Sequence, residues 1–267
     1  MPAGVQVYTS DTNIVQIDGN YSNLQMTAKG TVYSAYQTVP ANTNPNGTYY
    51  YDIPVAYVSF NAVSPVFAVS GGTSAAVVAT SNSGSSWTVT IWTPNGPAGV
   101  DWFVFDRATP ADSKSGLQVF NDAQQLVFDA QMKYLKVVGN VLDLVPVHSN
   151  GAVNGLTSPF TYGYSFPGKR IAIGAMLTPI NWGTTKWPSG ENTVPGAPNC
   201  RGLGLGCWRG VAGAAYFDFV HTIVTYRGYY DGGAVNQVFA NSAAVDDQSY
   251  PFGVRQFGAL LLDVTNY

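Results

Sequence analysis

The chain has 267 residues, of which only 10% are charged, and its formal net charge is -3. The 12 Lys and Arg residues are spread along the whole chain, which disfavours a nucleic-acid-binding protein because such a protein would cluster them. No apolar run reaches the length of a transmembrane helix, so we expect no membrane insertion. The abundant Gly, Pro, Tyr, Thr, Asn and Ser residues predict an all-β protein that is rich in turns.

The first residues predict where the protein is made. The segment from Met1 to Gly4 leads directly into the first expected strand, without the charged and apolar regions of a secretory signal. We therefore expect synthesis in the cytoplasm. The low charge and the many Tyr, Thr, Asn and Gly residues are nevertheless typical of a protein that is used outside the cell, or of a chain that buries much of its surface in an assembly.

A β-hairpin motif opens the chain and recurs in its middle. The segments Gly4 to Asp18 and Gly116 to Asp129 share Gly, Gln and Val residues at equivalent positions when they are aligned at an offset of 112. The match of Asp18 with Asp129 then requires one extra residue in the first copy, which is the count that a β-bulge gives. An internal repeat of this kind predicts two tandem domains.

The first predicted domain covers residues 1–107. Short strands broken by Gly are expected between residues 21 and 39, and residues 40–47 are expected to form a loop because of their composition. The stretch from Trp87 to Trp92 alternates, with Val89 and Ile91 on one face, as a half-buried strand does. Further strands follow at intervals of about ten residues up to a closing strand at 101–106, which predicts an antiparallel β-sandwich or barrel.

A polar linker at 108–115 precedes a second predicted β-sandwich domain, residues 116–267. The second copy is longer from its opening Gly to its closing Asp (116 to 263) than the first (4 to 106). We place the additional residues at about 150–210, where Gly, Pro, Asn and Trp predict a long, loop-rich insertion. The run 214–226 is expected to be a long strand, with a buried helix as the alternative.

Two cysteines, Cys200 and Cys207, lie at the end of the predicted insertion. Reduced thiols fit synthesis in the cytosol, and a local disulfide between the two is the alternative. A zinc site would need further Cys or His ligands, and the only histidines are His148 and His221. We therefore predict no metal site and no cofactor.

No residue pattern in the chain predicts catalysis. The Gly-x-Ser-x-Gly turn of a nucleophilic serine is absent, and strand alternation would send Asp218 and His221 to opposite faces. Paired carboxylates could hydrolyse a glycan, and the nearest candidates are Asp246 with Asp247, then Asp231 and Asp218. Because adjacent acids in a loop rich in Gly, Ser and Asn are more often solvated turn residues, we predict that the protein is not an enzyme.

Aromatic residues in and after the insertion are the better candidates for function. Tyr and Trp side chains bury much area on binding at a low cost in entropy. The alternative is that they pack the insertion onto its own domain. The five candidates are Trp182, Trp187, Trp208, Tyr229 and Tyr230.

The hairpin from Gly116 to Asp129 resembles the opening segment of a group of small structural proteins from the virions of tailed bacteriophages. These proteins lie around the tail tip, the baseplate or the tail fibre. Their N-termini look like the stretch Met1 to Tyr8, and they often close on an aromatic strand like Phe103 to Asp106. The resemblance covers the hairpins and the closing strands only. It implies a structural or attachment role and offers no catalytic residues.

We therefore expect a structural protein of the phage tail end that attaches to a host receptor or anchors fibres. Its expected partners are other tail proteins, further copies of itself in a homo-oligomer, with a trimer favoured, and a receptor on the host surface. The expected location is the virion tail, after synthesis in the bacterial cytoplasm. The alternatives are a head or neck decoration protein, a glycan-degrading tail enzyme and a free lectin-like module.

Overall fold

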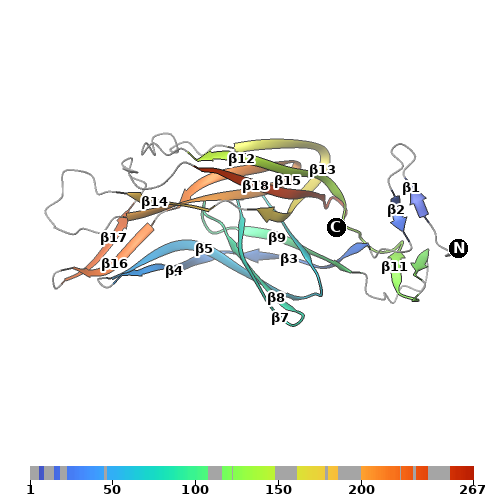
Figure 1. The fold of residues 1–267 in the computed structure, drawn as a ribbon, viewed down its shortest axis with the longest axis horizontal. Helices are drawn as coiled ribbons and strands as arrows, with labels where there is room; N and C mark the ends of the chain where they lie inside the picture. The colour runs from blue at the N-terminus through green and yellow to red at the C-terminus, as the bar shows by residue number, and fades with distance from the viewer. Residues whose placement is uncertain are drawn as a thin grey trace.

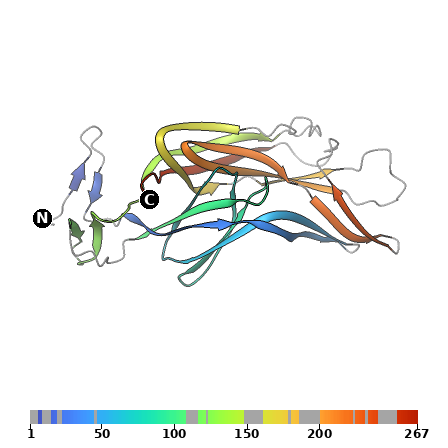
Figure 2. The same cartoon turned by 180° about the vertical axis from the view of Figure 1, so that it is seen from behind.

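The computed structural model describes the backbone of residues 6–8, 15–18, 23–44, 47–107, 116–121, 123–147, 161–177, 180–185, 200–222, 224–230, 233–239 and 253–267. Every regular element in these ranges is a β-strand of an antiparallel sheet, which confirms the predicted all-β class. The described residues form an elongated arrangement, and two small hairpins lie toward the end where the C-terminus is found (Figure 1). The view from behind shows the same arrangement (Figure 2).

The two hairpins are β1 (Gln6–Tyr8) with β2 (Val15–Asp18), and β10 (Gln118–Phe120) with β11 (Leu126–Asp129). They share one register, because Gln6 pairs with Asp18 as Gln118 pairs with Asp129. Each also skips one residue of its second strand, so the β-bulge is present in both copies. The extra residue of the first copy therefore lies in the connection between the strands, and the second strands align at an offset of 111.

Eight strands form the larger sheet, in the order β12-β18-β13-β6-β9-β3, with β15 beside β13 and β14 beside β15. The same pattern of strands recurs inward from either edge of this order. In each half of the chain, the first strand after the hairpin lies at the edge, the closing strand lies next to it, and a third strand lies at the centre. The strands are β3 (Leu24–Tyr33), β6 (Val66–Ser70), β9 (Gly99–Arg107), β12 (Val137–Val147), β13 (Thr161–Leu177), β14 (Ile180–Thr185), β15 (Cys200–Thr222) and β18 (Gly253–Asp263).

A shared irregularity shows that the repeat continues from the hairpins into this sheet. Against β9, strand β3 skips Thr27 between the pairs formed by Met26 and Ala28. Against β18, strand β12 skips Val138 between the pairs formed by Val137 and Gly139. The skipped residues differ by 111 positions, which is also the offset of the second hairpin strands. The two halves therefore repeat the same edge strand with the same bulge.

The smaller sheet has the order β17-β16-β5-β8-β7, with β4 beside β5. In β8, Val89 and Ile91 are buried, which confirms the predicted alternation. The predicted loop at Pro40 belongs instead to β4, an edge strand that can accommodate a residue without a backbone donor. The strands are β4 (Ala35–Asn44), β5 (Gly47–Asn61), β7 (Ala76–Ser83), β8 (Ser86–Trp92), β16 (Val224–Tyr230) and β17 (Gly233–Phe239).

Strands from the two halves of the chain share both large sheets. The sequence predicts one sandwich in each half. In the structure, β6 pairs with β13 in the larger sheet and β5 pairs with β16 in the smaller one. The region expected to be a loop-rich insertion contributes β13, β14 and the first part of β15, and β13 lies at the centre of the larger sheet. Of the predicted run 214–226, residues 214–222 in β15 and 224–226 in β16 are extended, as predicted. The expected linker at 108–115 lies outside the described residues.

Gly30 does not break its strand, although the sequence predicts short strands interrupted by Gly. Strand β3 passes through it without interruption. A Cβ atom at this position would come within 2.8 Å of the Trp102 ring on the neighbouring strand β9. The glycine therefore makes room for an aromatic side chain that covers it.

The seam between the halves is closely packed. One core cluster combines Phe103 and Phe105 of the first half with Ala172 and Leu262 of the second. The hydroxyl of Ser70 donates to the backbone carbonyls of Ile171 at 2.8 Å and Gly210 at 3.0 Å, inside the core. Both carbonyls belong to the second half, where the backbone of β15 passes so near to β13 that a Cβ atom on Gly210 would lie 2.2 Å from the Ile171 oxygen.

We predict that Gly210→Ala destabilises the protein by about 2–4 kcal/mol, because two backbones must separate to admit the methyl group. Denaturant unfolding of the purified chain measures this loss. Gly72→Ala is the matched control, since nothing lies within 4 Å of a Cβ atom at Gly72. Equal midpoints for the two variants would contradict the close approach of β13 and β15.

Candidate functional site

Four of the five predicted aromatic binding residues have side chains outside the described part of the structure. Trp182 lies on β14 opposite Leu203, and Tyr229 and Tyr230 lie on β16 opposite Ala234 and Gly233, but only their backbones are described. Trp187 lies wholly outside the described residues. Their role in binding therefore stays a prediction.

Trp208 is a core residue and not a surface contact. Its side chain is fully buried, and its ring packs against Phe217 at 5.1 Å and Phe257 at 5.9 Å between ring centroids. Its backbone exchanges two 2.8 Å hydrogen bonds with Ala75 of the first half. The sequence placed it among the binding candidates because a tryptophan beside many glycines looks like a loop residue, whereas it lies within the long strand β15.

The two cysteines lie seven positions apart on the same strand, β15. A strand rises about 3.3 Å per residue, so their Cα atoms are roughly 20 Å apart, whereas a disulfide needs about 4.4–6.8 Å. A bond between them would require β15 to fold back on itself. The thiol of Cys207 is buried, and its pKa is raised well above its ordinary value by this burial and by the charge of Asp218.

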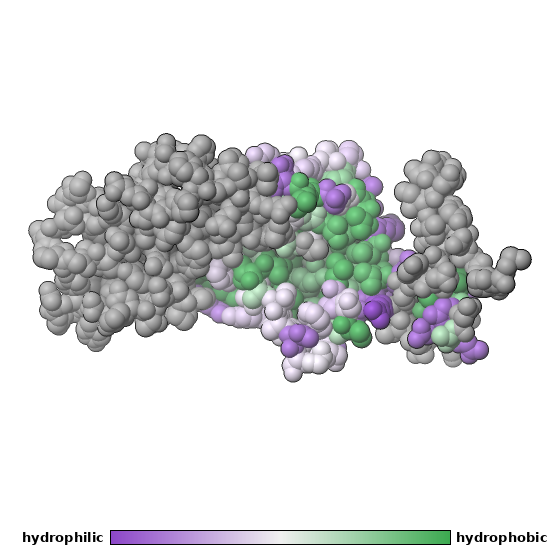
Figure 3. All heavy atoms as spheres, viewed as in Figure 1, coloured by the Kyte–Doolittle hydropathy of each residue, from purple (hydrophilic) through white to green (hydrophobic). Residues whose placement is uncertain are grey.

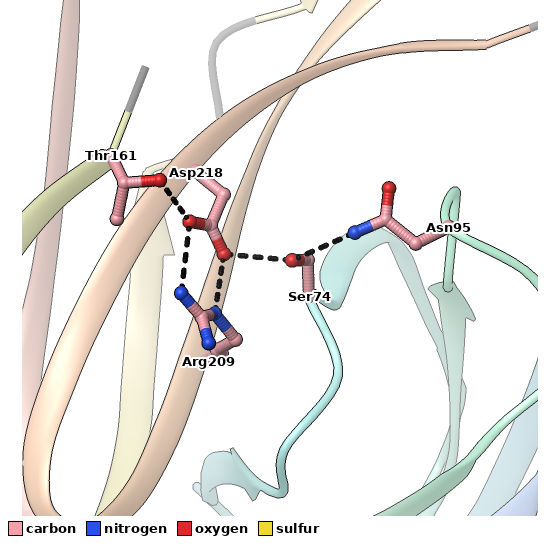
Figure 4. Close-up of polar contacts among 5 residues, drawn as sticks. All are labelled: Ser74, Asn95, Thr161, Arg209 and Asp218. Atoms are coloured by element: carbon pink, nitrogen blue, oxygen red, sulfur yellow. Dashed lines mark hydrogen bonds and ion pairs between the residues drawn. The ribbon is translucent and has the colours of Figure 1, made fainter. Parts of the chain in front are cut away.

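Asp218 lies at the centre of a cluster of five polar residues joined by hydrogen bonds (Figure 4). This carboxylate is buried near the end of β15, with 5% of the residue exposed. Arg209 of the same strand donates to it from Nε at 2.8 Å and from Nη2 at 3.4 Å. Thr161 at the start of β13 donates from Oγ1 at 2.8 Å. The second half of the chain thus supplies three members of the cluster.

The first half supplies the other two members. Ser74, in the connection between β6 and β7, donates its hydroxyl to Asp218 at 2.7 Å. Asn95, in the connection between β8 and β9, donates to the Ser74 hydroxyl at 3.2 Å. The guanidinium of Arg209 also lies 4.4 Å from the centroid of the Tyr216 ring, a cation–π contact. The cluster therefore joins two connections of the first half to two strands of the second.

The chemistry of this five-residue cluster fits a structural role that holds the two halves together, and we call the cluster the Asp218 clasp. Four hydrogen bonds occupy the two oxygens of the Asp218 carboxylate, which leaves little capacity to accept a proton from a substrate. The Ser74 hydroxyl donates to a carboxylate that is already paired with an arginine, and not to a histidine that could activate it. His221 lies three positions from Asp218 on β15, and its side chain is outside the described part of the structure.

The other acids that could form a catalytic pair, Asp231, Asp246 and Asp247, lie outside the described residues, as does His148. Within the described ranges, no group of three or more His, Cys, Asp or Glu residues could hold a metal ion. The same part of the chain contains no helix long and apolar enough to cross a membrane. Comparison with protein-family models, curated proteins and solved structures finds no match for this chain.

We predict that Asp218→Asn destabilises the protein by about 3 kcal/mol, because it leaves the partly buried Arg209 without its counter-charge. Asp101→Asn is the matched control. Asp101 also forms an ion pair across the two halves, with Arg170. Both side chains of this pair are a third or more exposed, so loss of the pair should cost no more than about 1 kcal/mol. Thermal or urea unfolding of both variants at one pH tests the difference, and equal losses would show that Asp218 is not a clasp.

We further predict that both cysteines carry thiols in the folded protein. Alkylation in denaturant without a reducing agent should add two groups, as seen by intact mass. Alkylation of the native protein at neutral pH should leave Cys207 unmodified, since it is buried and its pKa is raised. A single species that gains mass only after reduction would contradict the extended path of β15.

Proposed function

We propose that this protein is a structural component of the tail end of a bacteriophage virion, at the tail tip, the baseplate or the tail fibre. It acts by contact within an oligomeric assembly, in host attachment or fibre anchoring. The observation that carries the proposal is the duplicated hairpin, which stands outside both large sheets in each half of the chain and resembles the opening of such virion proteins.

The second hairpin has the properties of a contact surface. A two-stranded hairpin is at best marginally stable in water by itself, so it needs a surface to pack against. One side of β10–β11 is buried at Val119 and Val127, whereas Leu117 and Phe120 remain 53% and 52% exposed. Two apolar side chains left exposed, one in β10 and one just before it, are suited to burial against a neighbouring subunit.

Backbone hydrogen bonds to the larger sheet hold the segment after this hairpin in a defined place. The backbone amide of Met26 donates to Lys133 at 2.7 Å, and that of Leu135 donates to Leu24 at 2.8 Å. These bonds tie the segment after the second hairpin to the start of β3, which follows the first hairpin. A surface held in this way loses little entropy on binding, which favours contact as the mode of action.

The role of the described acids also supports contact over chemistry. Asp106 accepts hydrogen bonds from the backbone amides of Val63, Ser64 and Arg107. Asp129 accepts from the Gln118 side chain at 2.9 Å and from the Gln131 amide at 2.9 Å. Together with Asp218, these buried carboxylates hold the chain in place.

Localisation on the particle tests the proposal. Antibodies raised against the purified chain should label one end of the tail of intact virions by negative-stain microscopy. A deletion phage complemented with the double variant Leu117→Ser and Phe120→Ser should incorporate much less of the protein than wild type. Val63→Ser is the control, because Val63 is 73% exposed but lies between β5 and β6, outside the hairpins. Label on the capsid, or no label at all, would refute the proposal.

A further inference from the structure

One long stretch of the chain is almost free of charge. Between Ser34 and Val100, the only Asp, Glu, Lys or Arg residue is Asp52. This stretch contains β4, β5, β7 and β8 of the smaller sheet. About a quarter to a third of the residues on an ordinary soluble surface carry charge, so the outer face of these strands has an unusual composition.

The strand register identifies the residues of that outer face. Three cross-strand rows run over β5, β8 and β7, and paired residues of antiparallel strands point to the same side. We call these nine positions the hydroxyl face. The rows are Tyr57, Thr90 and Ala79; Ser59, Thr88 and Ser81; and Asn61, Ser86 and Ser83.

The hydroxyl face is solvent-exposed and polar. All nine residues are exposed or half-buried, and Ala79 is the one member without a side-chain hydroxyl or amide. The alternate residues of the same strands, such as Val58 and Val89, point inward and form the core. In the view of Figure 3, the β7–β8 hairpin that projects at the lower centre is mostly pale, the colour of side chains of intermediate hydropathy.

One aromatic ring is fixed on this face. The Tyr57 side chain is 52% exposed, and its hydroxyl donates to the side-chain oxygen of Gln37 on β4 at 3.0 Å. This bond restricts the ring, so that binding through it would cost less entropy. The neighbouring row holds a hydroxyl pair, Ser59 and Thr88, whose oxygens are 3.1 Å apart. Each hydroxyl can still accept or donate further hydrogen bonds.

These properties favour one class of ligand. An anionic ligand would need Lys or Arg residues, and the face has none. The core of a protein–protein interface is enriched in aromatic residues, Met and Arg but depleted in Ser and Ala, whereas Ser and Thr dominate here. A neutral polyhydroxyl ligand matches the face, because its hydroxyl groups can bond to the Ser, Thr and Asn side chains while its apolar C–H groups cover the tyrosine ring.

We propose that the hydroxyl face binds a neutral glycan, with Tyr57 packed against a sugar ring and the rows of Ser and Thr residues bonded to its hydroxyl groups. The face extends over three strands about 4.8 Å apart and over rows about 6.8 Å apart, so the ligand is an extended saccharide and not a single sugar. The inference rests on the proposed function in that it names the chemical class of the host receptor.

Affinity electrophoresis tests this proposal on the full chain. Native gels contain one of several neutral polysaccharides (dextran, mannan, laminarin or galactan), or the anionic polysaccharide alginate. At least one neutral polysaccharide should retard the wild-type chain, and alginate should not. Tyr57→Ala should weaken that binding at least about tenfold, a loss of roughly 1.4 kcal/mol. Ser59→Asp, which puts a charge at an exposed position in the centre of the face, should abolish it.

Tyr36→Ala is the matched control and should bind like wild type. Tyr36 is 64% exposed, but it pairs with Pro54 and therefore lies on the opposite face of the sheet from Tyr57. Unchanged unfolding midpoints establish that the variants are folded. The proposal is overturned if no neutral polysaccharide retards the chain, or if Tyr57→Ala binds as tightly as wild type. It is also overturned if the variants change the sedimentation coefficient, since a second copy of the chain would then cover the face.

The particle experiment separates this inference from the proposed function. Label at the tail end without glycan binding would refute the glycan site alone. Glycan binding by a chain that is absent from the virion would refute the proposed function while leaving the hydroxyl face as a saccharide site.

Discussion

The junction at Gly210, where Ser70 of the first half bonds to two strands of the second half, is the constraint on which the rest of the structure depends. At that point β15 runs against β13 with no space for a side chain, and the Ser70 hydroxyl bonds to a carbonyl from each strand. On one side of this contact, the pairing of β6 with β13 makes the larger sheet continuous. On the other side, Trp208 lies in the core beside Ala75, and Asp218 accepts a hydrogen bond from Ser74 in the connection between β6 and β7. Apolar burial supplies most of the favourable free energy of folding. The polar bonds of the seam fix how the two halves are aligned.

The symmetry of the larger sheet suggests how such a chain arises. Each half contributes an edge strand, a closing strand and a central strand, and both edge strands carry the same bulge at residues 111 positions apart. The two central strands, β6 and β13, are antiparallel neighbours. An arrangement of this kind places two like units about an approximate twofold axis, as in an isologous dimer. Within one chain the two units have diverged. The first carries the hydroxyl face on β5, β7 and β8, and the second carries the long strands β13 and β15.

The local part of this architecture could be predicted from the sequence, and the long-range part could not. Period-two alternation identified β8, the hairpin motif identified the repeat, and the aspartates at 106 and 263 marked the ends of the closing strands. Pairing between β6 and β13 leaves no local signal, because it depends on contacts between residues about a hundred positions apart. The glycines were wrongly interpreted for a physical reason. Gly30 and Gly210 permit close packing inside strands, whereas glycine in a sequence suggests a break or a loop. The hydroxyl face was missed because it is defined by an absence of charge at positions that only the strand register brings together.

The distribution of charge connects the fold to the function proposed for it. With 10% charged residues, the chain has few ionisable groups to distribute, and three of its acids, Asp106, Asp129 and Asp218, are buried. A buried carboxylate is tolerated only where hydrogen bonds or a counter-charge satisfy it, and each of these three has such partners. Groups bound in this way are poorly placed to exchange protons with a substrate. The described surface that remains is hydroxyl-rich on one sheet and apolar on the second hairpin, which suits adhesion through many weak contacts. Such contacts gain strength when several copies act together, so a neutral surface of modest affinity is most effective in an oligomer.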